Sequence, residues 1–300
     1  MGPLHTAALA ALTVTVAAQQ RCSLANVRRA DGSYQLGSCE QVLLFGANIG
    51  DEGVARLAAA LGDATRLQFL DLWSNGIGPK GAKALAEVLA ANKGPQKLFL
   101  NENTLGADGA TALAEALKTN SRLNTLWISN NVVGDDGAAA FAALLGRGCS
   151  LEVLDLWNNE IGPTGARAIA RALPHNYRLR TLELRGNSIG DDGASDLAEL
   201  MPKNRALSTL DVVGNGITAT GVNKMLDGLK CAAPRRIPLA PPSEAISPPP
   251  SVAPTAWRKC RSRVRLGRIS TAQPYLLLYA EGLPHMQWTS WQAKGQQDAP

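Results

Sequence analysis

Hydrophobic and polar positions repeat every 28 residues along this chain, seven times without a gap, from residue 39 to residue 234. Each copy follows the pattern L-x-x-L-x-L-x-x-N-x-I-G-x-x-G-A-x-x-L-A-x-x-L. The copies begin at Cys39, Leu67, Pro95, Leu123, Leu151, Leu179 and Leu207. The first copy holds Ala47 at the asparagine position, and the others hold Asn75, Asn103, Asn131, Asn159, Asn187 and Asn215. A constant period predicts a solenoid, in which each repeat packs only on its neighbours.

Within one repeat the apolar period changes from two residues to between three and four. In the copy that spans 67–94, Leu70 and Leu72 alternate with Phe69, Asp71 and Trp73, which predicts a short strand with one buried face. The asparagine and two glycines then mark a turn. The apolar positions after the turn have the spacing of one helix face and are Ala82, Leu85, Ala86 and Leu89.

Stacking these units predicts the overall shape. Neighbouring strands lie about 4.7–4.9 Å apart, whereas packed helices need about 8–10 Å between their axes. The stack must therefore curve with the strands inside. The predicted fold is an α/β solenoid, a horseshoe with a parallel sheet on the concave face and helices on the convex face.

The run LDLWNNEIGPTGARAIARAL at 154–173 resembles the 28-residue leucine-rich repeats of the ribonuclease-inhibitor type. Similar arrays occur in NOD-like receptors and in Ran GTPase-activating proteins. The resemblance covers about residues 39–230 and implies binding of a protein partner through an extended face. The chain departs from each relative, because its repeat length is constant, it has no G-x-x-x-x-G-K-[ST] motif, and its tail is basic rather than acidic.

Residues 1–38 form a separate N-terminal segment, and the sequence is consistent with two interpretations of it. It is expected to be a degenerate cap of the array, because Val14 and Val16 lie 28 residues before Val42 and Leu44. A targeting segment is the alternative. The run 7–18 is apolar and ends in residues that suit a cleavage site.

Two kinds of targeting segment stay open. A secretory signal would end at Val16-Ala17-Ala18, although no Lys or Arg precedes the apolar run. An organellar transit peptide is also consistent with residues 1–30, which contain no acid and carry Arg21, Arg28 and Arg29.

Residues 235–300 are expected to be a disordered tail. Prolines crowd 234–254, and a basic cluster follows at 258–265. Residues 231–300 hold nine Lys or Arg against three Asp or Glu, a net +6 that leaves −1 for residues 1–230 of the whole-chain +5. The array is therefore near neutral. The basic cluster suggests nuclear import or contact with nucleic acid, and a solvated segment is the simpler interpretation.

Cysteine usage favours a reducing compartment. The count of five is odd, the spacing is irregular, and no C-x-x-C is present. The five are expected to be free thiols, with Cys39 a small apolar core residue, and a disulfide framework is the alternative. No asparagine begins an N-x-[ST] acceptor. A cytoplasmic location is expected, with a secreted or organellar one as the alternative.

Candidate chemistry is sparse. The stretch 76–81 matches G-x-G-x-x-G, but Gly78 and Gly81 belong to positions that are glycine in nearly every repeat, so a turn explains them and no cofactor is expected. The acidic pairs at 135–136 and 191–192 stand where acids complement a helix N-terminus. We expect no metal site, no catalytic residue and no enzyme activity, because His5, His175 and His285 are widely separated.

The outward side chains of the strands are the candidate binding surface. Of the eight aromatic residues between 39 and 230, six are expected there. The selected set is Phe45, Phe69, Asp71, Trp73, Phe99, Trp127, Asp155, Trp157, Glu183 and Arg185. Exposed rings beside acids are typical of a protein-binding hot spot, although neighbouring rings also cover one another along a sheet.

The expected function is non-catalytic protein recognition through this concave face, in a regulatory or scaffold role. The acids indicate a partner that offers Lys or Arg beside an apolar surface. One alternative is a GTPase-activating protein similar to the Ran activators, and another is nucleic-acid contact through the basic tail.

Overall fold

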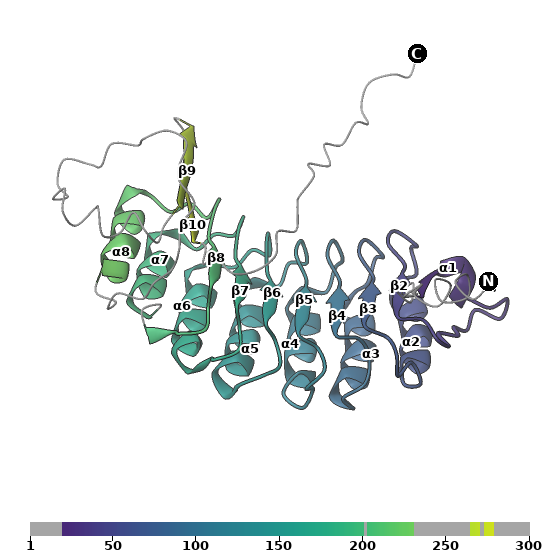
Figure 1. Cartoon of the computed structure of the whole chain (residues 1–300). Coiled ribbons are helices and arrows are strands. Elements are labelled where there is room, and N and C mark those ends of the chain that lie inside the picture. Colours follow the sequence, from purple (N-terminus) through teal and green to yellow (C-terminus); the bar gives the residue numbers. More distant parts are fainter. Residues whose placement is uncertain (1–19, 201–202, 231–264, 271–272, 279–300) are drawn as a thin grey trace, which may run out of the picture.

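The computed structural model describes residues 20–200, 203–230, 265–270 and 273–278. Figure 1 shows the repeats side by side in one curved row, with the strands in one layer and the helices in the other. The repeat strands are β2 Gln41–Leu43, β3 Phe69–Asp71, β4 Lys97–Phe99, β5 Thr125–Trp127, β6 Val153–Asp155, β7 Thr181–Glu183 and β8 Thr209–Asp211. The helices are α2 Gly50–Leu61, α3 Pro79–Ala90, α4 Gly106–Ala116, α5 Gly134–Arg147, α6 Pro163–Ala172, the 3₁₀ turn η1 Leu173–His175, α7 Gly190–Leu200 and α8 Ala219–Lys230. The predicted α/β solenoid is confirmed.

The repeat strands form one parallel sheet in sequence order, and each residue pairs with the residue 28 positions further on. Leu70, Leu98 and Leu126 are aligned across neighbouring strands and are fully buried. Successive strand side chains point to opposite faces. The leucines therefore face the helices, and the residues beside them face the concave surface.

The asparagine column connects neighbouring repeats. Asn131 is fully buried, and its Nδ2 donates to the carbonyls of Leu100, Ile128 and Ser129 at 2.9–3.0 Å. Its Oδ1 accepts from the N–H of Leu105 at 3.2 Å. Two of these partners belong to the preceding repeat. Each asparagine thus satisfies backbone groups that the turn would otherwise bury unpaired.

A second asparagine column, which the sequence analysis missed, makes the equivalent bonds at the other end of the helices. Asn120 donates from Nδ2 to the carbonyl of Leu89 at 2.7 Å and accepts the N–H of Leu123 at 2.8 Å. Asn176 and Asn204 bond in the same way. The 28-residue spacing of these positions was visible in the sequence.

Acids at the helix starts act between repeats rather than within one. Asp135 lies in the first turn of α5, as expected, but its Oδ1 accepts from the N–H groups of Gly162 and Gly165 at 2.7 and 2.8 Å. Asp51 bonds Gly78 and Gly81 with the same distances. The expectation that these acids cap their own helix is therefore corrected. Asp51 and Asp135 cap the next helix, whose own N-cap is glycine, and Asp191 accepts from the N–H and the hydroxyl of Thr218, just before α8.

A short strand extends the sheet before the first repeat, but it is not where the 28-residue spacing placed it. β1 Arg21–Ser23 pairs in parallel with β2, and Arg21 aligns with Gln41. α1 Leu24–Val27 follows, and Val27, Tyr34 and Leu36 join the buried core. Val14 and Val16 lie outside the described residues.

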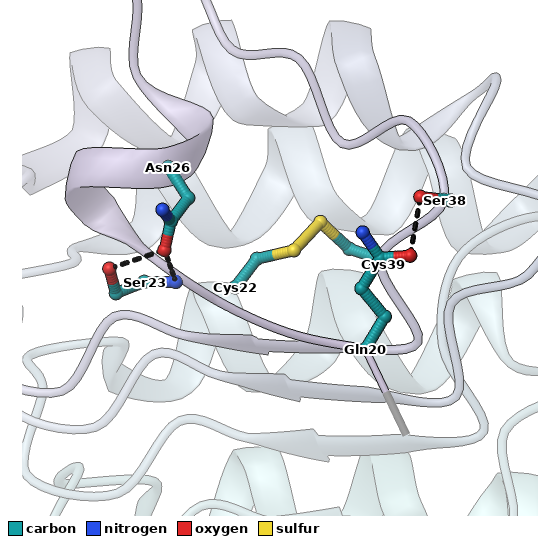
Figure 2. The surroundings of a disulfide bond; sticks show 6 residues. All are labelled: Gln20, Cys22, Ser23, Asn26, Ser38 and Cys39. Atoms are coloured by element: carbon teal, nitrogen blue, oxygen red, sulfur yellow. Dashed lines mark hydrogen bonds between the residues drawn. A yellow bond between two sulfur atoms is a disulfide. The ribbon is translucent and has the colours of Figure 1, made fainter. Parts of the chain in front are cut away.

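Two of the five cysteines are disulfide-bonded, which corrects the expectation that all are free thiols. Cys22 of β1 is joined to Cys39, which lies just before β2, with Cα atoms 6.0 Å apart (Figure 2). Both residues are buried. Cys39 is a core residue as expected, but it also anchors the cap to the first repeat. Cys149 is a free thiol.

Beyond the last repeat, β10 Gln273–Leu278 pairs antiparallel with β8, and β9 Arg265–Ser270 pairs antiparallel with β10. The structure therefore differs from the expected disordered tail in these two segments. The proline-rich stretch and most of the basic cluster lie outside the described residues. Among the helices that the structure describes, none is long and apolar enough to cross a membrane.

Candidate functional site

The concave face has the register that the repeat predicts. Its middle column, the third residue of each strand, reads Leu43, Asp71, Phe99, Trp127, Asp155, Glu183 and Asp211. The outer column lies two residues further along each repeat and reads Phe45, Trp73, Asn101, Ser129, Trp157, Arg185 and Val213. The face divides into an aromatic half, over β2 to β5, and an acidic half, over β6 to β8.

The rings of the aromatic half contact one another. Phe99 and Trp127 are stacked in parallel with centroids 4.1 Å apart, and Phe69 meets Phe99 edge-on at 4.7 Å. Phe45 meets Trp73 edge-on at 5.5 Å. Such contacts add about 0.5–1.5 kcal/mol beyond burial. The ring ladder between strands is therefore present, and it leaves Phe69, Trp73, Phe99 and Trp127 half-buried.

Two selected aromatic side chains are strongly exposed. Phe45 is 62% exposed at one end of the aromatic half, and Trp157 is 42% exposed at the border of the acidic half. The guanidinium carbon of Arg185 lies 5.9 Å from the centroid of Trp157, within the range of a cation–π contact. The indole Nε1 would lie 2.9 Å from a Cβ placed on Gly186. The missing side chain at Gly186 thus makes room for the ring.

Two polar atoms of the aromatic half are buried without a hydrogen-bond partner among the described residues. They are the Nε1 donor of Trp73 and the Oδ1 acceptor of Asn101. Their residues occupy neighbouring positions of the outer column, and Asn101 is only 4% exposed. Leaving a buried polar group unpaired costs about 1–3 kcal/mol. This pair is the least satisfied part of the concave face.

The acidic half holds three aligned carboxylates. Asp155, Glu183 and Asp211 occupy the same position on adjacent strands. The Oδ1 atoms of Asp155 and Asp211 accept from the N–H two residues further on, of Trp157 and Val213, both at 2.8 Å. Asp71 bonds the N–H of Trp73 in the same way at 3.0 Å.

Burial makes these carboxylates harder to ionise. Burial, and to a smaller extent the charges of Asp211 and Asp155, together raise the pKa of Glu183 to about 7, while Arg185 opposes the rise. Burial likewise raises the pKa of Asp155 to about 6, although its bond to the N–H of Trp157 opposes the rise. The pKa values of Asp211 and Asp71 are also raised, mainly by burial. Burial therefore opposes ionisation of the acidic half more than the mutual repulsion of its carboxylates does.

In the glycine-rich turn at 76–81, a side chain of the protein already fills the place that a phosphate would take. The Asp51 carboxylate already bonds the first N–H groups of α3, at Gly78 and Gly81. These are the donors that a phosphate would need at a helix N-terminus. Within the described part of the chain, no group of three or more His, Cys, Asp or Glu could hold a metal ion. His175 is exposed on η1, away from the concave columns.

The structure draws attention to two residues that the sequence analysis did not select. Asp211 completes the row of carboxylates, and its place in the middle column was already evident from the register. Asn101 lies in the outer column, but no sequence signal showed that its Oδ1 would be buried and unpaired.

Comparison with known proteins supports this architecture. A family model described as "Leucine Rich repeat" matches residues 65–86, 119–142, 149–170, 175–198 and 203–226. The chain therefore carries leucine-rich repeats. The first and third copies are not matched, but β2 with α2 and β4 with α4 have the same arrangement as the others.

A solved structure titled "Leiomodin-1 Actin-Binding Site 2 (ABS2)" is similar in part. The two sequences are 22% identical, and the match covers 50% of this chain and 89% of that chain with a TM-score of 0.42. A likeness of this degree carries no argument about binding. No curated protein sequence matches the chain.

Proposed function

We propose that this leucine-rich-repeat array recognises a protein partner through its concave face and acts as a non-catalytic regulatory or scaffold protein. The observation that carries the proposal is the concentration of aromatic side chains on one face. Six of them lie on the sheet, whereas the buried core uses Phe141 as its single phenylalanine among the described residues. Leucine-rich repeats are interaction modules, and this face is the most distinctive surface of the array.

Exposure within the aromatic half supports an anchoring role for its rings. Trp157 and Phe45 are exposed, and the ladder of Phe69, Phe99 and Trp127 lies half-buried between them. Rings held by their neighbours lose little side-chain freedom when a partner covers them. Rigid aromatic anchors of this kind dominate binding energy at protein interfaces.

The acidic half supports a partner with Lys or Arg next to its apolar contacts. A cation placed near Glu183 would favour the charged form of carboxylates whose pKa values are raised to about 7 and about 6. Binding would then release protons. Affinity should rise as the pH increases from about 5 to about 8, and it should weaken with added salt.

Capture of partners tests the proposal. The full chain is immobilised as wild type, as a Trp127→Ala/Trp157→Ala double variant, and as Tyr177→Ala. Tyr177 is a matched control because it is 70% exposed and lies off the concave face, between η1 and β7. Melting curves show whether each variant is folded.

We expect the double variant to lose the partner that wild type and Tyr177→Ala both retain. Truncating an interface anchor costs about 2–4 kcal/mol, which is roughly 30- to 1000-fold in affinity. Normal capture by a folded double variant would overturn the concave-face proposal.

A further inference from the structure

The N-terminal cap, residues 20–38, packs against the first repeat and is joined to it by a disulfide. β1 extends the sheet beyond the first repeat, and the disulfide joins Cys22 in this strand to Cys39 across a separation of 17 residues (Figure 2). Both cysteines are buried, and Val27 and Leu36 pack in the same core. The cross-link therefore holds together the segment that covers the first repeat.

A disulfide of this kind indicates an oxidising compartment. Structural disulfides form and persist in secreted proteins and in the compartments of the export pathway, and thiol reductants keep them open in the cytosol. The bond between Cys22 and Cys39 thus argues against the cytoplasmic location expected from the sequence.

The segment before the cap has the composition of an export signal. Residues 1–19 contain no Lys, Arg, Asp or Glu, and residues 7–18 are apolar apart from two threonines. A run of this length matches the apolar core of a signal peptide, and Val16-Ala17-Ala18 provides small residues before a cleavage point. No Lys or Arg precedes the apolar run within residues 1–6, and His5 is the one side chain there that can carry a positive charge.

The contacts of the N-terminal cap limit how many residues can be cleaved from the N-terminal side without disrupting the fold. The backbone carbonyl of Gln20 accepts from the N–H groups of Glu40 and Gln41 at 3.0 and 3.2 Å, and its side chain accepts from the hydroxyl of Ser38. Gln20 is therefore already part of the fold. A cut after Ala18 leaves this residue in place.

The same limit excludes the transit-peptide alternative for residues 1–30. The Nε of Arg21 donates to Gln41 at 3.1 Å, and Arg29 donates to Gln35 at the other end of the cap. The transit-peptide interpretation depended on the positive charge of these arginines, but in the structure they belong to the folded cap. Removing them would also remove Cys22 and its disulfide.

We infer that residues 1–18 are a cleavable export signal and that the Cys22–Cys39 disulfide forms after export. Hydrolysis of the peptide bond between Ala18 and Gln19 by a signal peptidase consumes one water and leaves a carboxylate on Ala18 and an amine on Gln19. The two thiols then lose two protons and two electrons to the disulfide of a thiol oxidoreductase, which becomes a dithiol.

Expression of the full chain in a secreting eukaryotic cell tests the inference. Material from the medium is alkylated without reduction, digested and analysed by mass spectrometry. We expect an N-terminal peptide that begins at Gln19 and a linked pair of peptides that contain Cys22 and Cys39. An intact Met1, a cut beyond Gln20, retention of the chain in the cytosol, or alkylation of both cysteines would overturn it.

Two variants separate the parts of the inference. Ala18→Arg should block cleavage while wild type is cut, and normal cutting of the variant would refute the assigned site. Cys22→Ser should lower the melting temperature by about 5–10 °C, and dithiothreitol should lower that of wild type equally. Cys149→Ser is the matched control and should leave the melting temperature unchanged. No difference between Cys22→Ser and Cys149→Ser would refute a structural role for the bond.

Discussion

Replacing Asn131 by alanine tests whether the asparagine column holds the repeats together. Of the groups that Asn131 contacts, the three carbonyls each keep a second donor. Leu100 is still bonded by Asn103, Ile128 by Asn159, and Ser129 by the N–H of Glu102. The change leaves them less well satisfied but not unpaired.

The N–H of Leu105, unlike these carbonyls, loses its acceptor when Asn131 is replaced. Its hydrogen-bond acceptor is Oδ1 of Asn131, at 3.2 Å, and Leu105 is fully buried. The substitution therefore strands one buried donor, at a cost of about 1–3 kcal/mol, and removes three donated bonds. We expect a total loss of about 2–4 kcal/mol in the free energy of unfolding, because the carbonyls keep their other partners.

Thermal melting followed by far-UV circular dichroism measures this loss. For an array of about 200 residues the melting temperature should fall by roughly 5–15 °C. Asn215→Ala removes the same kind of bonds from the last repeat, at the end of the stack. Because repeats contact only their neighbours, this change should loosen the last repeat and lower the main transition less. Asn223→Ala, at an exposed position of α8, is the control. Equal shifts for Asn131→Ala and Asn215→Ala, or no shift, would refute the reasoning.

Three further changes test other parts of the structure. Asp135→Ala removes the carboxylate that bonds the N–H groups of Gly162 and Gly165, and should lower the unfolding free energy by about 1–2 kcal/mol in a denaturant titration. Glu183→Gln removes a carboxyl group that is protonated more readily in the folded state, where its pKa is about 7 rather than 4.5. The stabilisation from this group is complete below pH 4.5 and is lost as the pH rises through 7. Glu183→Gln should therefore raise the melting temperature at pH 8 and leave it unchanged at pH 4. Glu152→Gln, at an exposed position, is the control and should change the melting temperature at neither pH. Truncation after residue 234 removes β9 and β10 from the edge of β8 and should leave a folded array with a modest fall in melting temperature; failure to fold would show that the tail is a required cap.

The sequence was sufficient to predict the repeat, the register and the direction of each strand side chain. A constant 28-residue period leaves no freedom in alignment, so Phe99 must lie between Asp71 and Trp127. The place of Asn131 in a column of turn asparagines followed from the same period. Local pattern is enough where every repeat makes the same contacts.

Features without a repeat were harder to predict. Cys22 and Cys39 are 17 residues apart, and β1 pairs at an offset of 20 rather than 28, so the period could not locate the cap or its disulfide. β9 and β10 join the sheet from a region with no repeat. Asp51 points to the next repeat rather than to its own helix, and that choice depends on the backbone direction at Gly78.

Details of the binding surface also depended on three-dimensional structure. The sequence placed Asp155 on the concave face, but its carboxylate turns to the N–H of Trp157, and the residue is only 8% exposed. The ring of Trp157 lies over Gly186, where a Cβ would come within 2.9 Å of its Nε1, and the residue is 42% exposed. The alternating strand pattern predicts which face of the sheet a side chain lies on. It does not predict the side-chain rotamer or the contacts with the turn that follows the strand.

Photo-crosslinking to the partner tests the central proposal most directly. A benzophenone amino acid replaces Trp157 in one full-length variant and Tyr177 in another, so that an exposed aromatic position on the concave face is compared with one off it. The variants are irradiated with the partner recovered by capture, and adducts are mapped by mass spectrometry. Our account predicts adducts from position 157 and none from position 177. Adducts from position 177 alone would contradict recognition through the concave face.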